Sequence, residues 1–226
     1  MQLAKYKYLL FDLDDTLLDF TSAEKWAFKK ILQDAQVEYS DEIFKTYKKI
    51  NKELWEKYEK GEIENSEVIN TRFKKFFKEL GKDVDGVFYD EKYRDYLSLG
   101  EWTFDRVKNT LEVLAKTHKL YIATNGVSIT QHTRLKNNDI KKYFTEIFIS
   151  SEIGYKKPEK EYFDFIFNKI GSNNKNEYLM IGDNLKTDIL GGVMAGIDTC
   201  FINAKKKEKI TDIIPTYEIE KVSEML

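Results

Sequence analysis

The chain has 226 residues, 42% of them hydrophobic and 14% aromatic, which is enough apolar material to bury a sizeable core. Its 37 lysines and arginines against 39 aspartates and glutamates give a net charge of -2, without the basic excess typical of a nucleic-acid binder. Cys200 is the single cysteine, and no apolar run reaches the 18 residues of a membrane helix. We expect a soluble cytoplasmic protein with no polynucleotide or membrane partner.

Short apolar runs, each bounded by a helical pattern, form the predicted sheet. The candidate strands are Lys7 to Leu13, Leu120 to Thr124, Ile147 to Ser150, Tyr178 to Gly182 and Asp198 to Ile202. Most are too apolar for a strand with one face in water. Because helical segments separate them, the pattern predicts an α/β fold with a Rossmann-like, doubly wound parallel sheet, whose ligands bind at the carboxyl ends of the strands.

The segment 21–100 interrupts this alternation with one helical pattern after another. Thr21 and Glu24 fit a capping box at the start of the first helix, and apolar residues recur at spacings of three and four in the later ones. We expect an inserted all-helical domain of 21–100, with 1–20 and 101–226 forming the α/β core.

The first strand ends in three carboxylates, Asp12, Asp14 and Asp15. Like charges a few ångströms apart raise one another's pKa, so this crowding favours a bound cation or a carboxyl group kept protonated as an acid. A calcium-binding loop does not fit, because Leu17 stands where the loop needs glycine and Ala23 where it needs glutamate. A solvated turn is the simpler interpretation of this segment taken alone.

Two further clusters follow later strands. Thr124, Asn125 and Gly126 place a hydroxyl, an amide and an unhindered backbone at a strand end, as a phosphate cradle requires. Lys157 precedes Pro158, which we expect to begin the next helix and so to fix the lysine near a helix N-terminus. Each cluster alone is also compatible with an ordinary surface loop.

The fourth cluster supplies two more carboxylates. Asp183 follows an apolar strand and Gly182, which lets the backbone come close to a ligand. Asp188 falls in the first turn of the next helix, where it could also act simply as a cap.

In this order the four clusters resemble the four motifs of the haloacid dehalogenase superfamily, across nearly the whole chain. The helical insert resembles the cap of that superfamily's first subclass. Several short segments are most similar to pyrimidine 5′-nucleotidases: Leu54-Trp55-Glu56, Thr71-Arg72-Phe73, Thr124-Asn125-Gly126 and Gly196-Ile197-Asp198-Thr199-Cys200.

The resemblance implies a phosphohydrolase that acts on small phosphomonoesters through an aspartyl phosphate. Asp12 would be the nucleophile, and Asp14 would protonate the leaving oxygen and then deprotonate the attacking water. Thr124 and Lys157 would bind the non-bridging phosphate oxygens. The implied substrate is a nucleoside monophosphate, and the protein would act as a monomer or a homodimer.

The resemblance also implies a Mg²⁺ cofactor. The carboxylates of Asp12 and Asp183 and the main-chain carbonyl of Asp14 would bind the ion, with Asp188 beside these ligands. The residues expected to contact substrate are Thr16, Asn125, Gly126, Phe20 and Trp102.

Other functions within and outside the superfamily stay open. A sugar-phosphate phosphatase or a phosphomutase would use the same residues. A haloacid dehalogenase needs no metal, and Asp14 with the pair Asp183 and Asp188 counts against it. A phosphate-accepting receiver domain shares several of these features, but it is far shorter and has no helical insert.

Overall fold

The computed structural model describes residues 2–204, 206 and 212–226. The charge of the basic run Lys205 to Lys209 predicts a solvated loop. This run lies outside the described residues, apart from Lys206. The chain forms two compact units, one made of Met1–Phe20 with Glu101–Leu226 and the other of Thr21–Gly100. Among the described residues, no helix is both long and apolar enough to cross a lipid bilayer.

The first unit contains a parallel sheet with the strand order β3-β2-β1-β4-β5-β6. Its strands are β1 (Tyr8–Phe11), β2 (Lys119–Thr124), β3 (Phe144–Ile149), β4 (Tyr178–Gly182), β5 (Asp198–Ile202) and β6 (Tyr217–Ile219). Strand order reverses between β1 and β4, which is where ligands bind in doubly wound sheets. The predicted α/β fold is confirmed.

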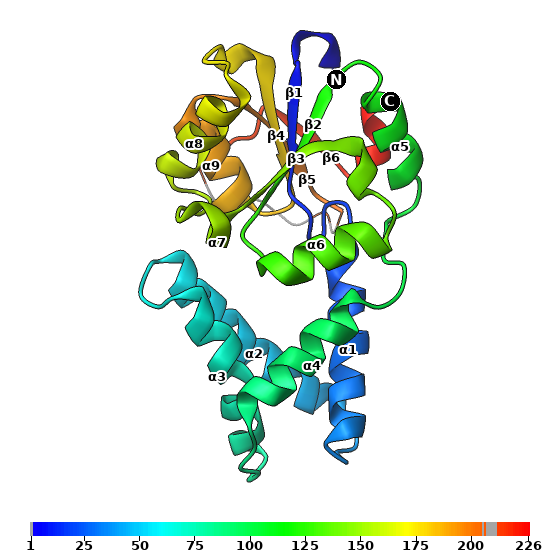
Figure 1. Cartoon of the computed structure of the whole chain (residues 1–226), viewed down its shortest axis with the longest axis vertical. Helices are drawn as coiled ribbons and strands as arrows, with labels where there is room; N and C mark the ends of the chain where they lie inside the picture. Colours follow the sequence, from blue (N-terminus) through cyan, green and yellow to red (C-terminus); the bar gives the residue numbers. More distant parts are fainter. Residues whose placement is uncertain (1, 205, 207–211) are drawn as a thin grey trace. The chain divides into compact units, whose positions relative to one another are not determined.

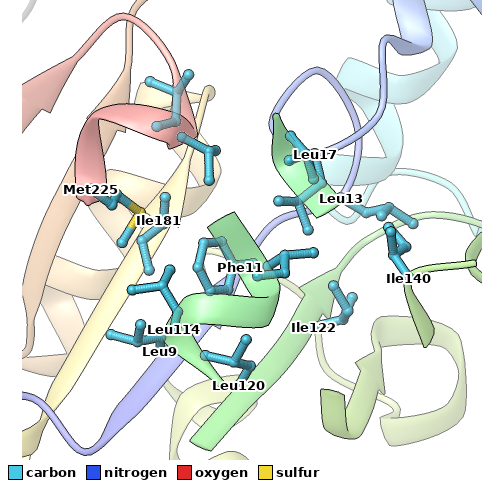
Figure 2. Close-up of a cluster of buried hydrophobic side chains, with 14 of the residues drawn as sticks. Leu9, Phe11, Leu13, Leu17, Leu114, Leu120, Ile122, Ile140, Ile181 and Met225 are labelled. Atoms are coloured by element: carbon cyan, nitrogen blue, oxygen red, sulfur yellow. The ribbon is translucent and has the colours of Figure 1, made fainter. Parts of the chain in front are cut away.

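Both faces of this sheet are covered by helices (Figure 1). The helices of the unit are α5 (Val107–Leu114), α6 (Ser128–Asn137), α7 (Ser150–Ile153), α8 (Lys160–Ile170) and α9 (Leu190–Ala195). Alternate strand residues point to opposite faces, so Leu9 and Phe11 pack with α5 while Leu10 packs with α8. The first of these clusters is shown in Figure 2, where Leu114 lies beside Leu9 and Leu120.

Several predicted boundaries were wrong. The strand expected over Lys7 to Leu13 covers Tyr8–Phe11, because the chain turns into a loop after Asp12. Pro158 does not begin the next helix, since α8 starts two residues later at Lys160. Strand β6 and helix α6 were not predicted.

The second unit consists of four helices, α1 (Phe20–Asp34), α2 (Asp41–Glu59), α3 (Asn65–Glu79) and α4 (Gly86–Ser98), the first of which starts at the last residue of the core unit. Because α1 starts at Phe20, Thr21 lies inside its first turn and not at the position before the helix. Aromatic rings fill the interior, with Tyr47 stacked on Phe28 and Phe73 at centroid distances of 4.5 and 5.4 Å.

A buried polar network connects all four helices of this unit. Arg72 on α3 donates to Asp90 on α4 at 2.5 Å and to Asn51 on α2 at 3.2 Å. Asn51 in turn donates to Glu24 on α1 at 3.1 Å, and Arg94 donates to the second oxygen of Asp90 at 2.7 Å. Asp90 therefore compensates two guanidinium groups.

Substitution of Asp90 tests the importance of this network. Asp90→Asn leaves Arg72 buried without its ion pair, which should lower the free energy of unfolding by about 3 kcal/mol in urea denaturation followed by circular dichroism. The control is Asp95→Asn on the exposed face of the same helix, with an expected change within about 0.5 kcal/mol. Equal effects of the two substitutions would contradict a dominant role for the buried pair.

Candidate active site

The loop after β1 carries the first two acidic residues of the candidate site. The Asp12 N–H donates to the Ile181 carbonyl at 2.8 Å, which anchors the end of β1 to β4. Two consecutive N–H groups, those of Leu17 and Leu18, donate to the Leu13 carbonyl at 3.0 Å. The loop is therefore tight and short, and it presents its acidic side chains at the carboxyl edge of the sheet.

Lys157 is buried between two of the acidic residues. Its Nζ donates to Asp12 Oδ1 at 2.7 Å, to Asp188 Oδ1 at 2.6 Å and to the Ala123 carbonyl at 2.6 Å, which uses all three ammonium hydrogens. Burial opposes the charge on this ammonium, but Asp12 and Asp188 outweigh it and raise the pKa of Lys157. The lysine is therefore a fixed positive charge at the base of the site.

Three carboxylates cluster at this site, and two of them bind the lysine. Asp12, Asp183 and Asp188 each offer an oxygen, and these oxygens all lie within 4.8 Å of one another. Asp188 is held by Lys157 and by the Asn184 N–H, which donates to its Oδ2 at 3.1 Å.

Gly182 makes room for this arrangement. A Cβ at Gly182 would lie 2.1 Å from Asp188 Oδ2, which is closer than a non-bonded Cβ can approach. The sequence predicted that this glycine would let the backbone approach a ligand. In the structure it gives space to the Asp188 side chain.

The electrostatics of the cluster favour a bound cation. Burial raises the pKa of Asp12 well above its usual value, Lys157 lowers it, and Asp188, Asp183 and Asp14 raise it further. One ammonium therefore does not compensate the negative charge. Three carboxylates with oxygens within 4.8 Å of one another could hold a metal ion, and Mg²⁺ prefers such oxygen ligands. Asp12, Asp183 and Asp188 are the groups that could hold it.

Thr124 lies at the end of β2 with both of its hydroxyl lone pairs engaged. The Gly126 N–H donates to Thr124 Oγ1 at 3.1 Å and Gln131 Nε2 donates to it at 3.0 Å. The hydroxyl hydrogen is therefore the part of Thr124 that can reach a ligand such as a phosphoryl oxygen. Gly126 again provides space, since a Cβ there would lie 2.3 Å from Gln131 Nε2.

Asp14 makes different contacts from Asp12. Arg134 Nη1 donates to Asp14 Oδ1 in a short ion pair, and Gln131 Nε2 donates to Asp14 Oδ2 at 2.8 Å. Both partners come from α6. The Asp14 side chain is 30% exposed, so it stays open to a ligand.

The structure gives Asn125 a role in supporting the Lys157 loop. Asn125 Nδ2 donates to the Lys157 carbonyl at 2.9 Å, and the Lys157 N–H donates to Asn125 Oδ1 at 3.0 Å. The amide expected to bind substrate thus pairs with both peptide groups of Lys157.

The other predicted substrate contacts lie around the same loop. The Thr16 hydroxyl is buried and has no hydrogen-bond partner in the described part of the chain. The Phe20 ring lies 5.4 Å from the Arg134 guanidinium, and the Trp102 backbone bonds to Asp19 and Asn138. Substrate contact by Thr16, Phe20 and Trp102 stays a prediction.

Gln131 and Arg134 were missed by the sequence analysis. Both are 1% exposed and lie three residues apart on α6, so they share a helix face. They follow Thr124 by seven and ten residues, and this helical spacing of three was the sequence signal that could have placed them on one helix face.

This geometry agrees with the comparisons to known proteins. The family model for haloacid dehalogenase-like hydrolases matches residues 6–196, and the chain belongs to this family of enzymes. The resemblance inferred from the four motifs is confirmed.

Similar proteins extend over nearly the full chain. The HAD-hydrolase YfnB of Bacillus subtilis is 41% identical, with 98% of this chain and 94% of YfnB covered. Two pyrimidine 5′-nucleotidases are also similar: PynA of Streptococcus pneumoniae (37% identical, 98% and 94% covered) and YjjG of Escherichia coli (30%, 98% and 96%). A crystal structure of YfnB bound to magnesium matches with a TM-score of 0.92 and 41% identity, covering 98% of this chain and 97% of that one.

The raised pKa of Asp12 predicts a pH dependence in metal-free protein. Above about pH 4 the unfolded chain has lost a proton that folded Asp12 retains, so the stability due to Asp12 is lost as the pH rises toward its folded pKa. The free energy of unfolding of wild type should therefore fall relative to Asp12→Asn, with a slope of up to about 1.4 kcal/mol per pH unit. Urea denaturation with a chelator, between about pH 4.5 and 7.5, measures this difference, and a constant difference would contradict the shift.

Proposed function

We propose that the protein is a Mg²⁺-dependent phosphohydrolase that removes phosphate from a small phosphomonoester through an aspartyl phosphate on Asp12. The observation that carries this proposal is a cluster of three carboxylates, Asp12, Asp183 and Asp188, two of which bind the buried ammonium of Lys157. A structural ion pair would need one carboxylate for one lysine. The excess negative charge points to a dication.

In the first step an Asp12 carboxylate oxygen attacks phosphorus. The bond from phosphorus to the ester oxygen breaks, and the leaving oxygen takes the bonding electron pair and a proton from Asp14. The hydrogen bond from Lys157 fixes the Asp12 rotamer, and the Thr124 hydroxyl hydrogen is available to a non-bridging oxygen.

In the second step water attacks phosphorus and Asp14 accepts its proton. The bond from phosphorus to Asp12 breaks, which releases inorganic phosphate and restores the carboxylate. A bound Mg²⁺ would neutralise charge on Asp12 and on the phosphoryl group, and we assign its protein ligands to Asp12, Asp183 and the main-chain carbonyl of Asp14, with Asp188 adjacent.

A nucleoside 5′-monophosphate, with a pyrimidine base, is the substrate we propose. The support is the similarity over 98% of the chain to two proteins named pyrimidine 5′-nucleotidases. A sugar phosphate is the second candidate, because the site described here recognises the phosphoryl group and not the leaving alcohol.

Substitution of the proposed nucleophile tests the chemistry. Asp12→Asn should reduce phosphate release in the presence of Mg²⁺ by at least about 10⁴-fold, since the amide cannot form the aspartyl phosphate. Asp15→Asn in the same loop is the matched control and should keep activity within about tenfold of wild type. Wild-type activity in Asp12→Asn would refute the assignment.

A substrate panel tests the narrower proposal. Deoxynucleotide, ribonucleotide and sugar monophosphates are compared by kcat/KM with Mg²⁺ and again with a chelator. We expect pyrimidine 5′-monophosphates to be the best substrates and the chelator to abolish turnover. A preference for sugar phosphates would remove the nucleotidase assignment and leave the phosphohydrolase standing, and a bisphosphate requirement would indicate a mutase.

A further inference from the structure

Helix α6 holds Asp14 by both of its carboxylate oxygens. Arg134 Nη1 donates to Oδ1 and Gln131 Nε2 donates to Oδ2. The two side chains are also bonded to each other, because Arg134 Nη1 donates to Gln131 Oε1 at 2.9 Å. Asp14, Gln131 and Arg134 thus form a closed triangle of hydrogen bonds.

The burial of Arg134 is hard to explain by stability alone. The residue is 1% exposed, and its ion pair with Asp14 is the one it makes among the described residues. Its Nε and Nη2 are buried and have no hydrogen-bond partner in the same part of the chain. A buried donor left unpaired is unfavourable, so a purely structural arginine would engage more of its guanidinium. Among the described residues, Nη1 is the guanidinium nitrogen that makes hydrogen bonds, and they go to Asp14 and to Gln131.

Gln131 connects this triangle to the proposed phosphate site. The two hydrogens of its amide nitrogen go to Asp14 Oδ2 and to Thr124 Oγ1. The residue proposed to carry the proton and the hydroxyl proposed to bind the phosphoryl group are therefore held at a fixed separation by one side chain.

The surroundings keep Arg134 in place. The Phe20 ring lies 5.4 Å from its guanidinium, and its backbone carbonyl accepts from Asn138 Nδ2 at 2.9 Å. The lack of a side chain at Gly126 leaves room for Gln131. The triangle is thus supported from α6, from the start of α1 and from the end of β2.

We infer that Arg134 is a positioning residue for Asp14, with Gln131 completing the arrangement, and that it acts on the proton-transfer step. This inference rests on the proposed function, in which Asp14 protonates the leaving oxygen. Small errors in the placement of a proton donor cost orders of magnitude in rate. Arg134 would therefore affect the rate most for esters whose leaving alkoxide needs a proton.

The test compares two leaving groups. Uridine 5′-monophosphate, or whichever nucleotide or sugar phosphate the panel identifies as best, needs a proton on its leaving alkoxide, whereas the phenolate of p-nitrophenyl phosphate leaves without one. The ratio kcat/KM is the appropriate quantity, because it covers the steps up to phosphoryl transfer to Asp12. Arg134→Met should lower it about 100-fold for the alkyl ester and less than about tenfold for the aryl ester.

Three further variants separate positioning from folding. Arg134→Lys should recover kcat/KM for the alkyl ester to within about tenfold of wild type, because a single nitrogen makes the contacts. Lys136→Met removes a positive charge from the exposed face of α6 and should match wild type on both esters. In an Asp14→Asn background, Arg134→Met should lower kcat/KM by less than about threefold, because Arg134 acts through Asp14.

The outcomes distinguish this inference from the proposed function. Equal losses on both esters, or a full additional loss in the Asp14→Asn background, would show that Arg134 serves the fold and would overturn the inference alone. Should Arg134→Met fail to fold, the Arg134→Lys variant decides by the same ratio between esters: a loss of kcat/KM that is larger on the alkyl ester supports positioning, and an equal loss on both esters, or no loss, refutes it. Wild type inactive on both esters with Mg²⁺ would instead refute the phosphohydrolase.

Discussion

The site depends on one buried ammonium group placed among carboxylates. Lys157 contributes all three of its hydrogens to Asp12, Asp188 and a backbone carbonyl, so it fixes one acidic side chain from the loop after β1 and one from the helical segment after β4. A buried lysine without these partners would be strongly destabilising, and buried carboxylates without the lysine would be as well. Each member of the cluster therefore requires the others. Burial raises the pKa of Asp12, Lys157 lowers it, and the negative charge of Asp188, Asp183 and Asp14 raises it further, which makes a dication a favourable addition.

The same packing solution appears at the ends of the two strands that flank β1. After β4, Gly182 leaves space for the Asp188 carboxylate, and after β2, Gly126 leaves space for the Gln131 amide. In both cases the side chain that fills the space comes from the helical segment that follows in sequence. The Asp188 carboxylate binds Lys157, and the Gln131 amide binds Asp14. The glycines thus act through the side chains they accommodate.

The sequence predicted the parts of the fold that apolar patterns specify. The strands that lead to Asp12, Thr124 and Asp183 were found because they are buried on both faces and form continuous apolar runs in the sequence. Helix α6 was missed because its buried positions include Gln131 and Arg134 while Ile129 is exposed, which is the reverse of an amphipathic pattern. Asn125 was expected at the substrate because its neighbours suggested a phosphate cradle, but its pairing with the Lys157 backbone is a long-range contact that no local pattern encodes.

The fold of the core unit does not by itself decide the chemistry, since one sheet edge with a nucleophilic aspartate can serve different displacement reactions. A displacement of halide needs no proton on the leaving group and no dication. Expulsion of an alkoxide from phosphorus needs a proton donor and compensation of charge. In this chain the residue two positions after Asp12 is an acid whose two oxygens are held by donors from α6. A lysine and the carboxylates of Asp183 and Asp188 lie beside Asp12. These surroundings, and not the sheet, are what favour phosphate esters over alkyl halides.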